Sequence, residues 1–340
     1  MRFAFSDDQL LFRDTVRDLL AKEVQPEQVR FAWLDEGGRL VDVWQALAEM
    51  GVLGVQVPEA HGGLGLSELD LVLLLEEAGR VALPDPLVET AAVGAPLLSE
   101  VGGEVATSWL PRLAAGEAVV AVSFDDAPVP YGGGADLLVA RRGDVLVAVP
   151  GDRVDAVAQP SVDGARTLAT VTWEAVDQVV LATGAAADAL VARARDRGAL
   201  GTAALLVGLG QQALDLTVAY VKERHQFGVP VGSFQAVKHH LADAALRLEF
   251  ARPVVHAAAW SMATGQPDAG RAVSHAKVAA SEAAAFTGRQ ALQCHGAIGY
   301  TVEYDLHLWL KRIWALAAAW GSPLEHRRAV AESLLGPITL

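Results

Sequence analysis

The sequence contains a single cysteine, Cys294, among its 340 residues. One thiol excludes an internal disulfide framework and any CxxC metal or redox site. Basic residues are also scarce, because 27 Lys and Arg stand against 41 Asp and Glu, which gives a formal net charge of −14. Without a long basic run, the chain lacks the cations that a nucleic-acid binder uses to neutralise phosphates. These shortages predict a protein of the reducing cytoplasm that does not bind nucleic acid.

Long hydrophobic runs are missing as well. The most apolar stretch, residues 199–209, is too short to span a bilayer and contains Gly201 and Gly208. The N-terminus carries Asp7 and Asp8 where a secretory signal would need an apolar run. We therefore expect no membrane segment and no targeting signal.

Apolar residues make up 52% of the chain and charged residues 20%. This balance excludes an intrinsically disordered chain, which needs low hydrophobicity together with high net charge. The candidate metal ligands His239, His240 and His256 are not spaced as a metal site requires, so packing or surface roles are expected for them.

The N-terminal part reads as helical. Ser6 and Gln9 form a capping-box pattern at the start of the first helix. Apolar periodicity predicts further helices near residues 40–50, 67–81 and 87–98, and a glycine-rich connector at 54–65. Short valine-rich runs separated by Gly, Asp and Pro then predict strands near 119–124, 136–140, 145–149, 167–173 and 178–181.

Helical patterns return from about residue 185 to residue 335. Breaks at 227–230, 265–267 and 295–299 leave four long helices joined by short loops, which is typical of an antiparallel bundle. The predicted fold class is α+β, mostly α. The expected domains are an N-terminal helical domain (1–117), a small β domain (118–184) and a C-terminal helical bundle (185–340).

Two C-terminal motifs stand out in the bundle. Residues 223–228 read Glu-Arg-His-Gln-Phe-Gly, and residues 293–300 read Gln-Cys-His-Gly-Ala-Ile-Gly-Tyr. Together with Val-Pro-Glu at 57–59, Gly-Gly-Leu-Gly at 62–65 and the helix–β–helix order, they resemble the acyl-CoA dehydrogenase family along essentially the whole chain. The resemblance implies an acyl-CoA dehydrogenase fold.

The resemblance also implies a cofactor, FAD, shared at a subunit interface. Arg224 matches the arginine that meets the pyrophosphate of a neighbour's FAD, although a helix C-terminal cation that balances the helix dipole is the simpler alternative. The other matching cofactor positions are Gln226, Phe227, Gln235, Gln293, Gly296 and Ala297. For Gln235, helix capping is an equal alternative.

The chemistry that the resemblance implies is α,β-dehydrogenation of an acyl-CoA thioester. A carboxylate base removes the α-proton, a hydride passes to FAD, and the electrons leave through electron-transfer flavoprotein. Family members carry this base at one of two positions, here called base slots. In this sequence the first slot falls on Trp320 or Gly321 and the second on Gly198, none of which accepts a proton. Asp196 and Glu325 are the nearest carboxylates and the weak candidates for this role.

The β domain also departs from the family pattern, because it is short and reads Ser-Phe-Asp-Asp-Ala-Pro at 123–128. Loss of both the base and the flavin-ring cradle predicts a chain similar to the short, base-lacking subunits of heteromeric α2β2 actinobacterial steroid side-chain acyl-CoA dehydrogenases. A second, longer subunit would then supply the base. Two alternatives stay open: a self-sufficient homotetramer with an unusual base, and a non-catalytic stabilising subunit.

Overall fold

The computed structural model describes residues 4–34 and 38–336. Chain contacts divide it into two compact units: unit 1 comprises residues 1–74 and 84–201, and unit 2 comprises residues 75–83 and 202–340. The outer limits predicted for the domains, residues 1 and 340, lie outside the described residues. The three-domain division stays a prediction.

Helices form the first part of unit 1. They are α1 (Asp7–Glu23), α2 (Pro26–Leu34), α3 (Val41–Glu49), α4 (Glu68–Arg80), the π-helix η2 (Val88–Gly94), α5 (Ala95–Val101) and α6 (Gly103–Ala114). The capping box of Ser6 and Gln9 is confirmed, with both reciprocal hydrogen bonds present. The sequence did not reveal α2 and α6, and the helix expected at 87–98 begins as a π-helix.

The connector between α3 and α4 needs its glycines. Gly62 has φ +83°, and a Cβ on Gly63 would overlap the carbonyl of Val57. The Leu64 N–H donates to Gly54 O at 2.8 Å, which closes the turn. The prediction of a close backbone approach in this segment is confirmed.

The strands of unit 1 are β1 (Val120–Ser123), β2 (Val129–Pro130), β3 (Leu137–Arg142), β4 (Val145–Pro150), β5 (Asp155–Gln159), β6 (Leu168–Thr172) and β7 (Val179–Thr183). One sheet has the order β1-β3-β4-β7 and the other β2-β6-β5. β1 runs parallel to β3, and β3 runs antiparallel to β4. The sequence predicted five of these strands and missed β2 and β5.

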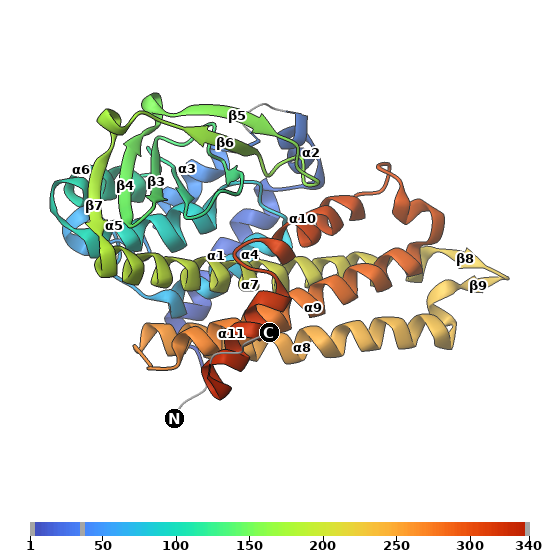
Figure 1. Ribbon diagram of the computed structural model, residues 1–340. Coiled ribbons are helices and arrows are strands. Elements are labelled where there is room, and N and C mark those ends of the chain that lie inside the picture. Colours follow the sequence, from blue (N-terminus) through green and yellow to red (C-terminus); the bar gives the residue numbers. More distant parts are fainter. Residues whose placement is uncertain (1–3, 35–37, 337–340) are drawn as a thin grey trace. The chain divides into compact units, whose positions relative to one another are not determined.

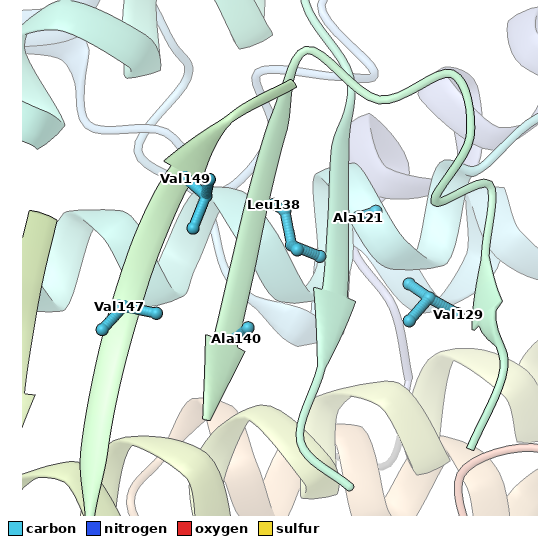
Figure 2. Packing of buried hydrophobic residues seen from close by; sticks show 6 residues of the cluster. All are labelled: Ala121, Val129, Leu138, Ala140, Val147 and Val149. Carbon is cyan, nitrogen blue, oxygen red and sulfur yellow. The ribbon is translucent and has the colours of Figure 1, made fainter. Parts of the chain in front are cut away.

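Small and branched side chains fill the core of the strand region (Figure 2). The buried cluster consists of Ala121, Val129, Leu138, Ala140, Val147 and Val149. Four successive residues of β3 and of β4 are buried, which explains their continuous apolar runs in place of polar–apolar alternation. By contrast, β5 is exposed along most of its length.

Unit 2 is the helical bundle. It contains the second half of α7 (Gly184–Glu223), then α8 (Gln235–Ala263), α9 (Ala269–His295), η6 (Gly296–Tyr300), α10 (Leu306–Ala318) and α11 (Pro323–Leu335). A short hairpin of β8 (His225–Gln226) and β9 (Val229–Pro230) joins α7 to α8 and projects beyond the ends of α8 and α9 (Figure 1). All three predicted breaks are confirmed.

The expectation of four long helices was wrong in one respect. The last segment divides at Ala319–Ser322 into two helices of 13 residues each. Gly321, with φ +97°, and Pro323, in the first turn of α11, stop one helix and start the next.

Candidate functional site

A groove of about 880 Å³ lies at one end of unit 2, where the C-terminal ends of α7 and α9 meet the start of α8. Its walls come from four segments: the end of α7 with the hairpin, the first turns of α8, the last residues of α9, and η6 with Thr301. The lining residues that were predicted to bind a cofactor are Arg224, Gln226, Gln293, Gly296 and Ala297. The structure thus brings five of the seven predicted cofactor residues to one cavity.

The hairpin gives Arg224 and Gln226 their positions. Its tight turn has positive φ at both central residues, +54° at Phe227 and +79° at Gly228, which is the backbone of a type I′ hairpin. The Val231 N–H donates to Arg224 O at 2.7 Å and anchors the hairpin to the end of α7. The sequence Phe-Gly therefore encodes the turn that presents Arg224 and Gln226 at the groove.

Arg224 carries the charge of the groove. Its guanidinium is exposed and makes no hydrogen bond or ion pair with any described residue. No carboxylate is found among the described residues that line the groove. In a protein of net charge −14, this arrangement leaves a local site that attracts an anion. Arg224 also follows the last residue of α7 directly, so the dipole-balancing alternative is compatible with the same position.

The glycine loop after α9 forms the opposite wall. Gly296 has φ +63°, and no atom lies within 4 Å of the place where a Cβ would stand. Its N–H is already bonded to the carbonyls at the end of α9, Leu292 O and Gln293 O. Gly296 therefore leaves open space at the groove, where a side chain would otherwise stand. Its N–H is not available to a ligand, because it caps the end of α9.

His295 is a groove residue that sequence reasoning missed, although it lies inside the Gln-Cys-His-Gly motif. It is 4% exposed, and its Nδ1 lies 2.8 Å from Ala291 O. Since a carbonyl only accepts, Nδ1 carries the proton and donates. The ring stacks on Tyr220, with centroids 4.3 Å apart, and lies 4.8 Å from the ring of Tyr304. Burial lowers the pKa of His295, which favours the neutral ring.

Two predicted cofactor residues lie outside the groove lining. Phe227 is 93% exposed at the hairpin tip, where its ring packs edge-on against Phe234 at a centroid distance of 6.2 Å. Gln235 is the exposed first residue of α8. A role for Phe227 and Gln235 in cofactor binding stays a prediction.

The first base slot is a tight turn without a carboxylate. Trp320 has φ +56° and Gly321 φ +97°. A Cβ at Gly321 would stand 2.7 Å from His326 Nε2, so a side chain there meets both a ring and an unfavourable backbone. His326 binds Trp320 O at 2.9 Å and Ser274 Oγ at 3.1 Å, which holds the turn in place.

Lys277 also binds this turn. Its ammonium donates to Leu316 O, Ala317 O and Gly321 O at 3.0–3.2 Å, and to Ser281 Oγ at 3.2 Å. These carbonyls belong to the end of α10 and to the turn, so the buried cation caps the helix.

The two weak candidates for the base differ in their surroundings. Glu325 is exposed, and its carboxylate accepts from the Ser322 N–H at 2.7 Å in the capping box of α11. Asp196, in α7, has no hydrogen-bond or ion-pair partner among the described residues, and burial raises its pKa to about 6. The second base slot, Gly198, is buried two residues further along. The raised pKa of Asp196 is a property that general bases often show.

Among the described residues, no group of three or more His, Cys, Asp or Glu side chains is placed to hold a metal ion. One described helix, α7, is long and apolar enough to cross a membrane, and 56% of its most apolar window is buried, as in the core helix of a folded protein.

A helical bundle thus follows a small sheet region in the chain, and a groove that attracts anions lies at one end of the bundle. Residues 6–117 match the family model described as acyl-CoA dehydrogenase, N-terminal domain, and residues 180–335 match acyl-CoA dehydrogenase, C-terminal domain.

Individual relatives align with this chain along nearly its whole length. Acyl-CoA dehydrogenase IpdE2 of Mycolicibacterium smegmatis is 37% identical over 334 residues, covering 96% of this chain and 99% of that protein. IpdE2 of Mycobacterium tuberculosis is 33% identical over 320 residues, covering 94% and 95%. The chain belongs to the acyl-CoA dehydrogenase family, whose members are FAD-dependent oxidoreductases acting on CH–CH groups.

Solved structures show the same fold. A variant of the Tcur3481-Tcur3483 steroid ACAD superposes with a TM-score of 0.86 at 26% identity, covering 96% of this chain and 98% of that one. A chain of the ChsE4-ChsE5 complex of M. tuberculosis gives a TM-score of 0.88 at 21% identity, with full coverage of both chains.

Proposed function

We propose that this chain is the base-lacking subunit of a heteromeric acyl-CoA dehydrogenase that acts on a steroid side-chain CoA thioester in the cytoplasm. It contributes one half of an FAD site at a subunit interface, and a longer partner subunit supplies the catalytic base and the flavin-ring pocket. One observation carries the proposal: the turn at 320–321 has no carboxylate, while Arg224 in the groove is unpaired among the described residues.

The groove suits the dinucleotide part of FAD. Arg224 would bind the pyrophosphate, because a guanidinium donates to phosphate oxygens in a paired geometry. Gln226 and Gln293 offer amide groups for the polar sugar and phosphate atoms. No lining carboxylate opposes the anion. Bound FAD supplies the hydride acceptor of the family's reaction, and this chain's residues bind and orient it.

The partner and the substrate class are supported by the relatives. The Tcur3481-Tcur3483 steroid ACAD, at 26% identity, is named for two proteins and for steroids. If this chain pairs with a second subunit in the same way, it can lack a base and still form part of a dehydrogenase, because the second subunit supplies the base. Electron-transfer flavoprotein is the expected electron acceptor of the assembled enzyme.

The test is co-expression of the chain with a candidate longer subunit, followed by measurement of bound FAD and of steroid-CoA dehydrogenation. Arg224→Ala is expected to lower FAD retention at least about tenfold, the equivalent of one charge-assisted contact. Lys222→Ala, which removes an exposed cation two residues before Arg224 and outside the groove lining, is the matched control. Full FAD loading and activity of the chain expressed alone would refute the heteromeric role.

Asp196 favours a second candidate, the self-sufficient dehydrogenase. A partly buried carboxylate with a pKa near 6 and no hydrogen-bond partner among the described residues has the properties of a general base. If the chain alone is active, Asp196→Asn should abolish turnover and leave FAD content unchanged. If Arg224→Ala changes neither FAD content nor rate in the complex, the chain is instead a stabilising subunit.

A further inference from the structure

We infer that His295 is a positioning residue: its ring, held between Tyr220 and Tyr304, fixes the segment 296–301 that forms one wall of the groove. The inference rests on the proposed function, since it takes FAD as the ligand of the groove. The resemblance places the cofactor contacts at Gln293, Gly296 and Ala297 and assigns nothing to His295.

Three segments meet at this ring, and one of them, the end of α7, is distant in sequence from the other two. Tyr220 lies in the last turn of α7, His295 is the last residue of α9, and Tyr304 follows η6. The His295 and Tyr220 rings are stacked at 21°, the His295 and Tyr304 rings are tilted at 50°, and the two tyrosine rings meet edge-on at 5.6 Å. Flat rings packed in this way fix each other's orientation, and with it the chain on either side of the loop.

The nitrogens of His295 explain why packing, and not a ligand contact, is its role. Nδ1 donates to Ala291 O, one turn earlier in α9, and so ties the ring to its own helix. Nε2 then bears a lone pair, has no hydrogen-bond partner among the described residues and is shielded from solvent. A ligand in the groove does not reach a shielded atom, so the face of the ring is what His295 contributes.

The wall above the ring depends on this support. Gly299 of η6 approaches His295 so closely that a Cβ there would stand 3.0 Å from His295 Cβ. At the other end of the loop, Gly296 has no atom within 4 Å of its Cβ position and a left-handed φ. The segment is therefore packed against the last turn of α9 at Gly299 and open at Gly296. The ring adds the contacts with Tyr220 and Tyr304, which tie the chain after the loop to the end of α7.

The experiment measures how fast FAD leaves the co-purified complex on dilution, from the rise in flavin fluorescence. His295→Ala removes the ring, and FAD release should accelerate about tenfold, as expected for the loss of one preorganised wall. His295→Phe keeps a flat ring and should restore release to within about twofold of the wild type. His295→Leu keeps most of the volume without a flat ring and serves as the second variant if the alanine variant does not fold.

His326→Ala is the control, because it removes a half-buried histidine of unit 2 that does not line the groove. It should lower the melting temperature and leave FAD release unchanged. If His295→Phe releases FAD as fast as His295→Ala, a ring nitrogen and not the flat ring supports the groove, and the inference is wrong. Unchanged release in both the alanine and leucine variants would also overturn it. If the wild-type complex holds no FAD, the proposed function is wrong as well. If the wild-type complex holds FAD and the His295 variants release it at the wild-type rate, only the inference is wrong.

Discussion

At the scale of single residues, Lys277 shows how this chain accommodates a charge in its interior. The side chain is fully buried, and burial lowers its pKa to about 7. Among the described residues, the ammonium donates hydrogen bonds only to uncharged oxygens. Three of these are carbonyls at the end of α10 and in the turn that follows. Nothing in the sequence around Lys277 reveals this, because its three carbonyl acceptors lie about 40 positions further along the chain.

Replacing Lys277 by Met is expected to destabilise unit 2 by about 1–3 kcal/mol, because shielded carbonyls lose their donor while the volume is nearly kept. Denaturant unfolding of the variant measures the loss. Lys222→Met, at an exposed site of α7, is the control and should change the free energy of unfolding little. Equal stability of Lys277→Met and wild type would mean that these hydrogen bonds do not support the turn.

Asp196 carries a prediction of pH dependence. Its pKa in the folded state, about 6, lies above the ordinary value of 3.8 because burial disfavours the charged form. The protonated form therefore contributes stability that is fully present below pH 3.8 and is lost as the pH rises through 6. At pH 7.5 the ionised group costs up to roughly 3 kcal/mol.

Asp196→Asn should remove that cost. Its free energy of unfolding is expected to be close to that of the wild type below pH 4, to exceed it increasingly between pH 4 and 6, and to keep a constant excess above pH 7. The control is Asp144→Asn, at an exposed turn between β3 and β4. A difference between Asp196→Asn and wild type that does not grow with pH would show that Asp196 is solvated.

At the scale of elements, α4 and α7 approach each other closely through two glycines. A Cβ on Gly208 of α7 would overlap the carbonyl oxygen of Glu76, and one on Gly79 of α4 would overlap that of Leu205. The sequence flagged Gly208 only as a break in an apolar run. The close crossing is a tertiary property, because the atoms that require the glycine belong to the other helix.

Gly208→Ala should cost about 1–3 kcal/mol through overpacking, even though alanine is the better helix former. Gly134→Ala, at a site with no atom within 4 Å of the Cβ position, is the control. Thermal unfolding followed by far-UV circular dichroism gives the comparison. A more stable Gly208→Ala variant would contradict the tight crossing.

Prediction of the elements succeeded where a pattern was local. Gly-rich and Pro-rich breaks at 227–230, 265–267 and 295–299 end helices in the structure as expected. The π-helix at Val88–Gly94 could not be foreseen, because its seven residues are all buried and tertiary packing decides their backbone. The strand β5 was missed because its exposed, mixed composition has no apolar periodicity.

At the scale of the whole molecule, the proposed function predicts that FAD stabilises an assembly and not the single chain. A ligand held between two subunits binds only when both are folded and joined, so it stabilises the complex by about 2.7 kcal/mol at a concentration of 100 times its Kd. Thermal unfolding with and without added FAD should show a shift for the complex with the longer subunit. A shift of equal size for the chain alone would show that its own groove suffices.

Local chemistry in the sequence by itself determined the helix–strand–helix order, the family, and the cluster of Arg224, Gln226, Gln293, Gly296 and Ala297, because these lie in short motifs whose turns are encoded by neighbouring residues. Tertiary structure alone decided the roles of His295, Lys277 and Gly208. Each of them acts on atoms contributed by segments far away in the chain, and only folding brings those atoms within contact distance.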